Sequence, residues 1–233
     1  MTTIPSLPQT NLQLYALMQE RGYGEEALDA ANRAYLLVAK QTCGILRGSG
    51  KPFCCHLVGT AAILVHEDEP ADMVTAGLLH AAYQNRVPFL GQVAIEPRRR
   101  YIREAFGGAV EDLVNDYHHF EMARLDGFSD EQLAERRNAV MIRVADELED
   151  MLDHGVAMHG KPADDAAVGG SAASRQAQKA ALANDYLRAA RIAGAPFIEQ
   201  QLLHWLRQTA DVQWPPSLRT GEYSSFQVGQ PIW

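Results

Sequence analysis

Hydrophobic residues recur at intervals of three and four positions along most of this chain, the spacing that gives an α-helix one apolar face. The segment that starts at Glu25 is an example, with apolar side chains at Leu28, Ala31 and Val38. No segment combines strict alternation of apolar and polar residues with enrichment in β-branched residues, as a half-buried strand would. The pattern therefore predicts an all-α fold.

Glycine, proline and polar clusters divide this pattern into separate helices. Gly22 closes the first helix, Pro70 suits a first helical turn, and Ser129 suits a helix N-cap. A helix that carries His56 near its start is expected to end at Glu67. The other predicted helices cover residues 11–20, 25 to about 46, 70 to about 85, 98–105, 109–121, 130–154, 176–193 and 197–208.

The chain is expected to form a helical domain over residues 1–158, with C-terminal helices and a tail over 177–233 packed on the same domain. Residues 159–176 are rich in Gly, Ala, Ser and Asp, which predicts a flexible loop. From Asp211 onward, aromatic residues and prolines follow no helical spacing. Because exposed aromatic area is unfavourable in water, we expect this tail to cover its own domain or a sister subunit.

Composition and charge narrow the choice of partner. The 233 residues are 47% hydrophobic, enough for a sizeable core. A net charge of −8 argues against a nucleic-acid polymer or an anionic membrane as a partner, because both need clustered cations. The one basic run, Arg98 to Arg100 with Arg103, is expected to be a solvated helix start, with an anion contact as the alternative. With no signal-peptide pattern and no membrane-length apolar stretch, we expect a cytoplasmic protein with reduced cysteines.

Three separated segments carry the candidate chemistry: RGSGKPFCCHLVGTAAIL from Arg47, AGLLHAAYQN from Ala76 and VADELEDML from Val144. In order and spacing they resemble the motifs of the hydrolase domain of Rel/Spo-type alarmone (ppGpp) hydrolases, a branch of the HD superfamily. The segment YIREAFGGAVEDLVNDY, between the second and third motifs, also resembles that family. The resemblance covers about residues 35–155 and implies an HD-domain helical bundle with a metal site.

The resemblance implies that His56, His80 and Asp146 bind one divalent metal ion. Two imidazoles and one carboxylate form a facial set with open coordination positions, which suits Fe(II), Mn(II) or Zn(II). Where the family has the Asp of its His-Asp pair, this chain has Ala81, so the site has one carboxylate fewer. On the residues alone, a metal-free pocket in which the three side chains hydrogen-bond one another stays open.

Further candidates surround this metal set. Gln84 and Asn85 stand at the catalytic position, where the family has an acidic pair that activates water, and amides cannot act as bases near neutral pH. The candidate substrate-binding residues, two of them cations suited to an anion, are Arg47, Lys51, Tyr83 and Asp150. Carboxylates such as Asp150 are also typical of a solvated helix face.

His118 and His119 are a further possible source of a metal ligand. The two side chains point about 100° apart on a helix, so at most one can add a ligand, and both are expected to be packing or surface residues.

The sequence leaves three classes of function. The first is an HD-superfamily metal-dependent enzyme that acts on a small anionic metabolite, either as a phosphohydrolase or in a diverged reaction such as an oxidation. The alternative is a pseudo-enzyme that keeps the pocket without the metal and binds a nucleotide or other small ligand in a regulatory role. The third is a partner protein whose aromatic tail docks elsewhere. A homodimer is left open in each case.

Overall fold

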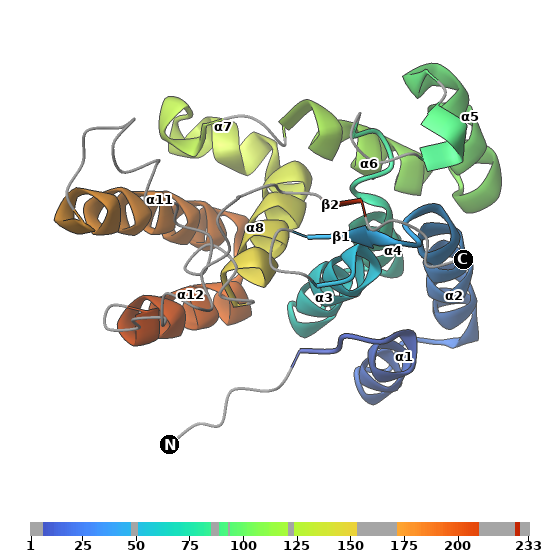
Figure 1. Cartoon of the computed structure of the whole chain (residues 1–233), viewed down its shortest axis with the longest axis horizontal. Helices are drawn as coiled ribbons and strands as arrows, with labels where there is room; N and C mark the ends of the chain where they lie inside the picture. Colours follow the sequence, from blue (N-terminus) through green and yellow to red (C-terminus); the bar gives the residue numbers. More distant parts are fainter. Residues whose placement is uncertain are drawn as a thin grey trace.

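The computed structural model describes residues 7–47, 51–84, 89–92, 94–120, 124–152, 172–209 and 227–228. Nearly all of them lie in helices, which confirms the all-α prediction (Figure 1). The described strands, β1 (Ile45–Leu46) and β2 (Gln227–Val228), are short and pair antiparallel. Within these residues, none of the helices has the length and hydrophobicity that a membrane crossing requires.

The first two helices begin as predicted, but the second is shorter. Thr10 caps α1 (Asn11–Glu20) through a capping box with Gln13. Next, α2 (Glu25–Gln41) ends before the predicted end near residue 46. The prediction was wrong there because Gly44 takes a positive φ of 77°, which breaks the helix, and β1 then pairs with β2 instead of continuing the helical face.

The centre of the fold is α3 (Phe53–His66), which is buried on all sides from Leu57 to Val65. It packs against α4 (Ala71–Leu79), against α8 (Arg137–Leu152) and against α1. A helix that is apolar around its whole circumference belongs in a core rather than at a surface. Because α3 carries His56 near its start, the candidate site starts from a helix in the core of the fold.

The predicted helix from Pro70 to about residue 85 is also shorter in the structure. Its last helical residue is Leu79, and His80 is the C-cap. The guanidinium of Arg98, a buried residue, donates hydrogen bonds to the carbonyl oxygens of Ala82 and Gln84. These bonds give the carbonyl oxygens of Ala82 and Gln84 a partner in the turn that follows α4. The helix can therefore end at His80 without unpaired backbone groups at these two positions.

The middle of the chain forms α5 (Ile95–Phe106) and α6 (Gly108–Phe120), with short 3-10 turns at Phe89–Gln92 and Leu125–Gly127. The single helix predicted over 130–154 is two helices, α7 (Asp130–Glu135) and α8 (Arg137–Leu152). Ser129 caps the first of them, as predicted. The chain breaks at residue 136: α7 packs mainly against α11 (Ala172–Ala193), whereas α8 packs against α3 and α6 as well as α11.

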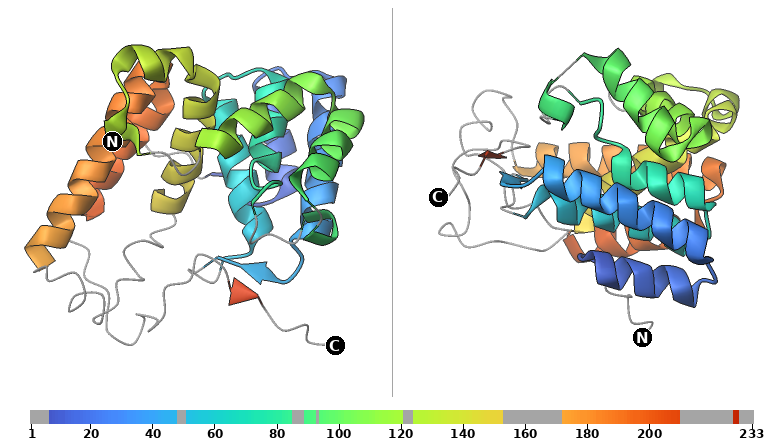
Figure 2. Two further views of the ribbon diagram at one scale, coloured as in Figure 1. Left: turned by 90° about the horizontal axis from the view of Figure 1, so that it is seen from above. Right: turned by 90° about the vertical axis from the view of Figure 1, so that its right-hand side faces the viewer.

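The last helices are α11 (Ala172–Ala193) and α12 (Pro196–Thr209), joined through Gly194, which has a φ of 71°. Their bounds are close to the prediction, although α11 begins earlier than residue 176. Both helices contact α8, and Figures 1 and 2 show them on the side of α8 that faces away from α2. The rest of the predicted flexible loop, and the aromatic tail apart from β2, lie outside the described residues.

Candidate metal centre

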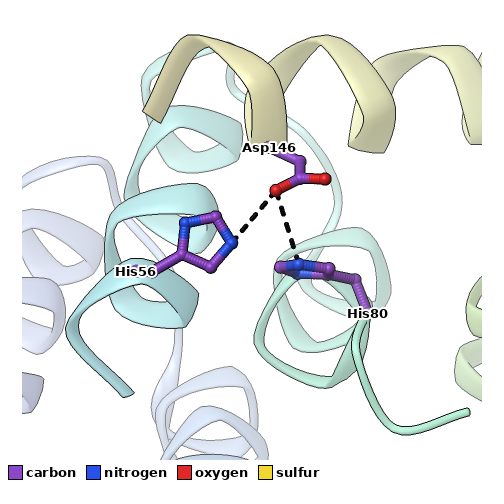
Figure 3. A group of neighbouring side chains, drawn as sticks. All are labelled: His56, His80 and Asp146. Carbon is purple, nitrogen blue, oxygen red and sulfur yellow. Dashed lines mark ion pairs between the residues drawn. The ribbon is translucent and has the colours of Figure 1, made fainter. Parts of the chain in front are cut away.

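The predicted metal set is brought together at the meeting point of three helices (Figure 3). His56 comes from α3, His80 from the end of α4, and Asp146 from α8. The Oδ1 atom of Asp146 lies 3.0 Å from His56 Nε2 and 3.6 Å from His80 Nε2. One possible donor atom from each residue lies within 4.8 Å of the others, and both histidines are only 1% exposed. The donor atoms are therefore close enough together, and well enough shielded from solvent, to hold a metal ion.

His80 is held as a neutral imidazole with a defined tautomer. Its Nδ1 lies 2.7 Å from the carbonyl oxygen of Gly77, which can only accept a hydrogen bond, so Nδ1 carries the proton. Burial, with smaller contributions from His56 and Arg47, outweighs the raising effects of Asp146 and of the Gly77 carbonyl and lowers the pKa of His80 to about 4. The lone pair of Nε2 is therefore available, and it is on the side that faces Asp146.

A second layer of side chains orients His56. Its Nδ1 lies 2.6 Å from Glu149 Oε2 and 3.5 Å from Asp150 Oδ1. The other oxygen of Glu149 accepts a hydrogen bond from Lys51. A carboxylate behind a metal-binding histidine fixes the orientation of the ring and raises its basicity. The sequence motifs did not assign this role to Glu149, although its spacing of one helical turn from Asp146 on α8 was a signal for it.

Gly59 makes room for Glu149. A Cβ atom at this position on α3 would lie 2.5 Å from the Oε1 atom and 2.6 Å from the Cγ atom of Glu149. Any larger residue would therefore push the carboxylate away from His56. Gly59 is needed here for close approach between two helices rather than for an unusual backbone angle.

The two predicted substrate-binding cations both contact carboxylates. Arg47, which directly follows β1, donates to Asp150, and its guanidinium lies 5.6 Å from the centre of the Phe53 ring. Lys51 pairs with Glu149 in the same way. By distance alone His56, Glu149 and Asp150 form a second group that could hold a metal, but these cations already neutralise its carboxylates. This second group is better described as the outer layer of the first.

The site carries an excess of negative charge when both histidines are neutral. Asp146, Glu149 and Asp150 contribute three negative charges, and Arg47 and Lys51 contribute two positive ones. Three minus two leaves one negative charge. The protein compensates for it with a proton on His56, as the pKa of that residue shows.

Burial, and then Arg47, lower the pKa of His56, but the carboxylates of Asp150, Glu149 and Asp146 outweigh both and raise it to about 9. Burial raises the pKa of Asp146, yet His80, His56 and Arg47 together hold it well below its usual range. Asp146 is therefore ionised and His56 protonated near neutral pH. That proton occupies the place where a metal ion would supply the missing positive charge.

The Nε2 atom of His56 is buried and finds no hydrogen-bond partner among the described residues. It lies 3.0 Å from Asp146 Oδ1, close enough for an ion pair, but its N–H direction is not aligned for a hydrogen bond. An unsatisfied buried polar atom costs about 1–3 kcal/mol and is rare in folded proteins. Metal coordination would satisfy this atom together with its two neighbours.

The other predicted site residues lie around the cluster in different ways. The hydroxyl of Tyr83 donates to Glu111 Oε1 at 3.2 Å and so contacts an acid outside the metal set. Gln84 is half-buried; its backbone N–H donates to the Ala81 carbonyl, and its own carbonyl accepts from Arg98. Asn85 lies outside the described residues.

The histidine pair on the last turn of α6 stays outside the described metal-capable groups. His118 packs its ring 5.8 Å from that of Tyr83, and His119 is exposed. Tyr117, in contrast, was missed by the sequence motifs. It is 1% exposed, and its hydroxyl donates to Asp146 Oδ2 at 2.6 Å. No sequence signal marks this tyrosine, because only the packing of α6 on α8 brings it to the site.

Comparison with known proteins adds one finding. Residues 37–122 match a family that is described as a domain of unknown function, DUF6817. The matched part includes His56 and His80 but not Asp146. No curated protein matches this chain.

Proposed function

We propose that this chain is a metal-dependent enzyme of the HD superfamily that acts on a small anionic metabolite. One divalent ion, Fe, Mn or Zn, would bind to His56, His80 and Asp146. The observation that carries the proposal is the buried Nε2 atom of His56, which makes no hydrogen bond among the described residues although it lies beside an ionised carboxylate and a neutral imidazole. The order and spacing of the three HD-like motifs support the same assignment.

The chemistry of the donor set fits a borderline metal rather than calcium or magnesium. Two imidazoles and a single carboxylate suit Zn(II), Fe(II) or Mn(II), whereas calcium and magnesium prefer several oxygen ligands. When bound, the ion would act as a Lewis acid on a substrate oxygen or on a water molecule. Glu149 would hold the His56 ring, and the Gly77 carbonyl would hold the His80 ring, in the orientation for binding.

The charge of the loaded site supports an anionic substrate. A divalent ion would replace the proton on His56, so the five charged side chains and the ion together would sum to one positive charge, whereas the same side chains and the proton sum to zero. Arg47 and Lys51 keep 15% and 11% of their side-chain surface exposed, so both retain some contact with solvent at this centre. A small anion would therefore be attracted to the loaded site.

Phosphoester hydrolysis is the first reaction to test. Gln84 cannot act as a base, so the water would need another proton acceptor. Asp150 is a candidate, because burial raises the pKa of its carboxyl group and 28% of its side chain is exposed. An oxidation is the second reaction, since two histidines and one carboxylate leave coordination positions for dioxygen.

The rival proposal is a pseudo-enzyme that binds a small ligand without metal. It is favoured by the protonated His56, which balances the site charge without any ion. Elemental analysis of protein purified without chelator or affinity metal separates the two proposals, with His80→Ala as the comparison. We expect about one equivalent of a transition metal, lost in the variant. Protein that stays metal-free, and takes up no Fe, Mn or Zn on reconstitution, would contradict the metalloenzyme proposal.

The substrate is then sought with the loaded protein. A panel of phosphomonoesters and nucleotides, with phosphate release as the readout, tests hydrolysis, and oxygen consumption in the iron-loaded protein tests oxidation. The His80→Ala variant is the background control for both assays. Ligand binding that persists in the presence of a chelator, without turnover of any compound, would instead support the pseudo-enzyme.

A further inference from the structure

The two oxygens of Asp146 face different partners. Oδ1 lies 3.0 Å from His56 Nε2 and 3.6 Å from His80 Nε2, so it is the oxygen that belongs to the metal set. Oδ2 accepts a hydrogen bond of 2.6 Å from the hydroxyl of Tyr117. A phenol that donates to a carboxylate at this distance makes a strong, charge-assisted hydrogen bond. This hydrogen bond therefore fixes the orientation of the Asp146 carboxylate group.

Tyr117 is itself fixed in place. Its side chain is buried on α6, and its ring packs edge-on against the ring of His80, with the centroids 5.3 Å apart and an interplanar angle of 81°. Because α6 also packs against α8, the hydroxyl and the carboxylate are held by elements in direct contact. A rotation of Asp146 that turned both oxygens toward the imidazoles would break the hydrogen bond and leave a buried hydroxyl unpaired.

We propose that Tyr117 is a positioning residue that makes Asp146 a one-oxygen ligand and thereby keeps coordination positions of the metal open for substrate. This inference rests on the proposed metal site. A carboxylate that bound through both oxygens would occupy two positions, whereas the arrangement in the structure offers the ion three protein donor atoms, one from each residue. Three donors leave at least one position open even at a four-coordinate ion.

The chain offers a matched control. Tyr83 is also fully buried, and its hydroxyl also donates to a buried carboxylate, Glu111 Oε1, at 3.2 Å. Glu111 does not belong to the described metal-capable groups. Tyr117→Phe and Tyr83→Phe therefore remove the same kind of hydrogen bond at nearly equal cost in packing, and only the first touches a candidate ligand.

The test is direct metal binding, measured without any substrate. The Kd of Zn(II) is determined by competition with a chelator, and Co(II) serves as a spectroscopic probe of coordination. We expect Tyr117→Phe to weaken Zn(II) binding about 10–100-fold, the usual effect of losing a partner of a metal ligand, and Tyr83→Phe to change it less than about twofold. The visible spectrum of bound Co(II) should change in Tyr117→Phe alone, because the freed Oδ2 can enter the coordination sphere.

A double-mutant cycle separates positioning from general loosening of the site. If Tyr117 acts through Asp146, adding Tyr117→Phe to Asp146→Asn should cause no further loss of Zn(II) affinity. Additive losses, equal effects of the two tyrosine variants, or an unchanged Kd and Co(II) spectrum in Tyr117→Phe would each overturn the inference. A failure of the unsubstituted protein to bind Zn(II) or Co(II) would overturn the proposed function as well.

If Tyr117→Phe does not fold, the unsubstituted protein still tests the inference. With tyrosine labelled by carbon-13 at the ring carbon that bears the hydroxyl, Zn(II) should shift the signal of one buried tyrosine, and Asp146→Asn should remove that shift. No tyrosine shift on saturation with Zn(II) would show that the hydroxyl is not coupled to the ligand, and this result would overturn the inference.

Discussion

Two buried carboxylates in this molecule, Glu111 and Asp146, have contrasting surroundings. Glu111 has a fully buried side chain, and its oxygens accept from Arg99 at 2.7 Å, from Arg103 at 2.5 Å and from Tyr83. Asp146 lies between two imidazoles, one of which has a ring nitrogen without a hydrogen-bond partner among the described residues. Both carboxylates have hydrogen-bond or ion-pair partners. Only Asp146 has a neighbour, His56, whose ring nitrogen makes no hydrogen bond among the described residues.

Glu111 belongs to a structural charge cluster, whereas Asp146 belongs to a candidate binding site. Burial raises the pKa of Glu111, but hydrogen bonds from Arg99 and Arg103 outweigh it and hold the pKa below its usual value, so the cluster is complete as it stands. Around Asp146 the balance requires an additional positive charge, which a proton on His56 supplies when no metal is bound. Burial of an acid is thus a poor indicator of function, whereas an unfilled donor position is a useful one.

The largest effect is expected for the loss of a ligand. Asp146→Asn should weaken Zn(II) binding by more than about 100-fold, because even outer-layer partners are worth 10–100-fold. Isothermal titration or chelator competition measures the loss, and Asp112→Asn, a change at an exposed acid on α6, is the control. A Kd for Zn(II) in Asp146→Asn that matches the unsubstituted protein would remove Asp146 from the set.

For Glu111 we expect the opposite result, a loss of stability without a loss of Zn(II) binding. Glu111→Gln leaves Arg99 and Arg103 without their buried partner, and these arginines are 33% and 50% exposed, so water can solvate them in part. We expect a loss of about 2 kcal/mol in the free energy of unfolding, below the 3–5 kcal/mol typical of a fully buried pair. Urea denaturation measures this loss. The Kd for Zn(II) should not change, and a large change would mean that the two regions are coupled.

A smaller effect is expected for the outer layer of the metal centre. Glu149→Gln keeps the size of the side chain but removes the charge that His56 and Lys51 contact. Zn(II) binding should weaken about 10–100-fold. Gly59→Ala should reproduce part of this loss, because the added methyl group displaces the same carboxylate. If Glu149→Gln binds Zn(II) normally, the carboxylate serves folding rather than the metal.

The last effect is a graded dependence of Zn(II) binding on pH, which is small for each step of one pH unit. The raised pKa of His56, about 9, means that this ring holds a proton at neutral pH, which a metal ion has to displace. His80, with a pKa of about 4, has already lost its proton there. The affinity for Zn(II) should therefore rise about tenfold for each pH unit between about pH 6 and 8, and level off near pH 9. A Kd that is flat over this range would contradict the combination of a raised pKa and a ligand role for His56.

Helical periodicity predicted the order of the described helices and some of their bounds, such as those of α1, but neither the ends of α2 and α4 nor the division of 130–154 into two helices. The apolar pattern continues through Ile45 and Leu46, yet these residues pair with β2, a partner far along the chain. The turn after the early end of α4 is bonded by Arg98, which lies on α5. Such contacts between distant residues override local pattern, and a single sequence does not show them.

The metal set was predicted because its spacing follows a recognisable motif order, and the structure brings His56, His80 and Asp146 together. The outer layer was harder to predict. Glu149 could be found from its helical spacing to Asp146, whereas Tyr117 reaches the site only through the packing of two helices. The anionic partner of Arg47 and Lys51 in this structure is a pair of carboxylates, and a charge pattern alone does not distinguish these from a substrate.

The pairing of β1 with β2 has a consequence for folding. It joins positions about 180 residues apart in the sequence, whereas the three metal-binding candidates span about 90. Closing a longer loop costs more chain entropy, and a protein made from its N-terminus cannot form this pairing until residue 228 has left the ribosome. The imidazole and carboxylate cluster can therefore assemble during synthesis, while the strand that leads into Arg47 is paired only afterwards.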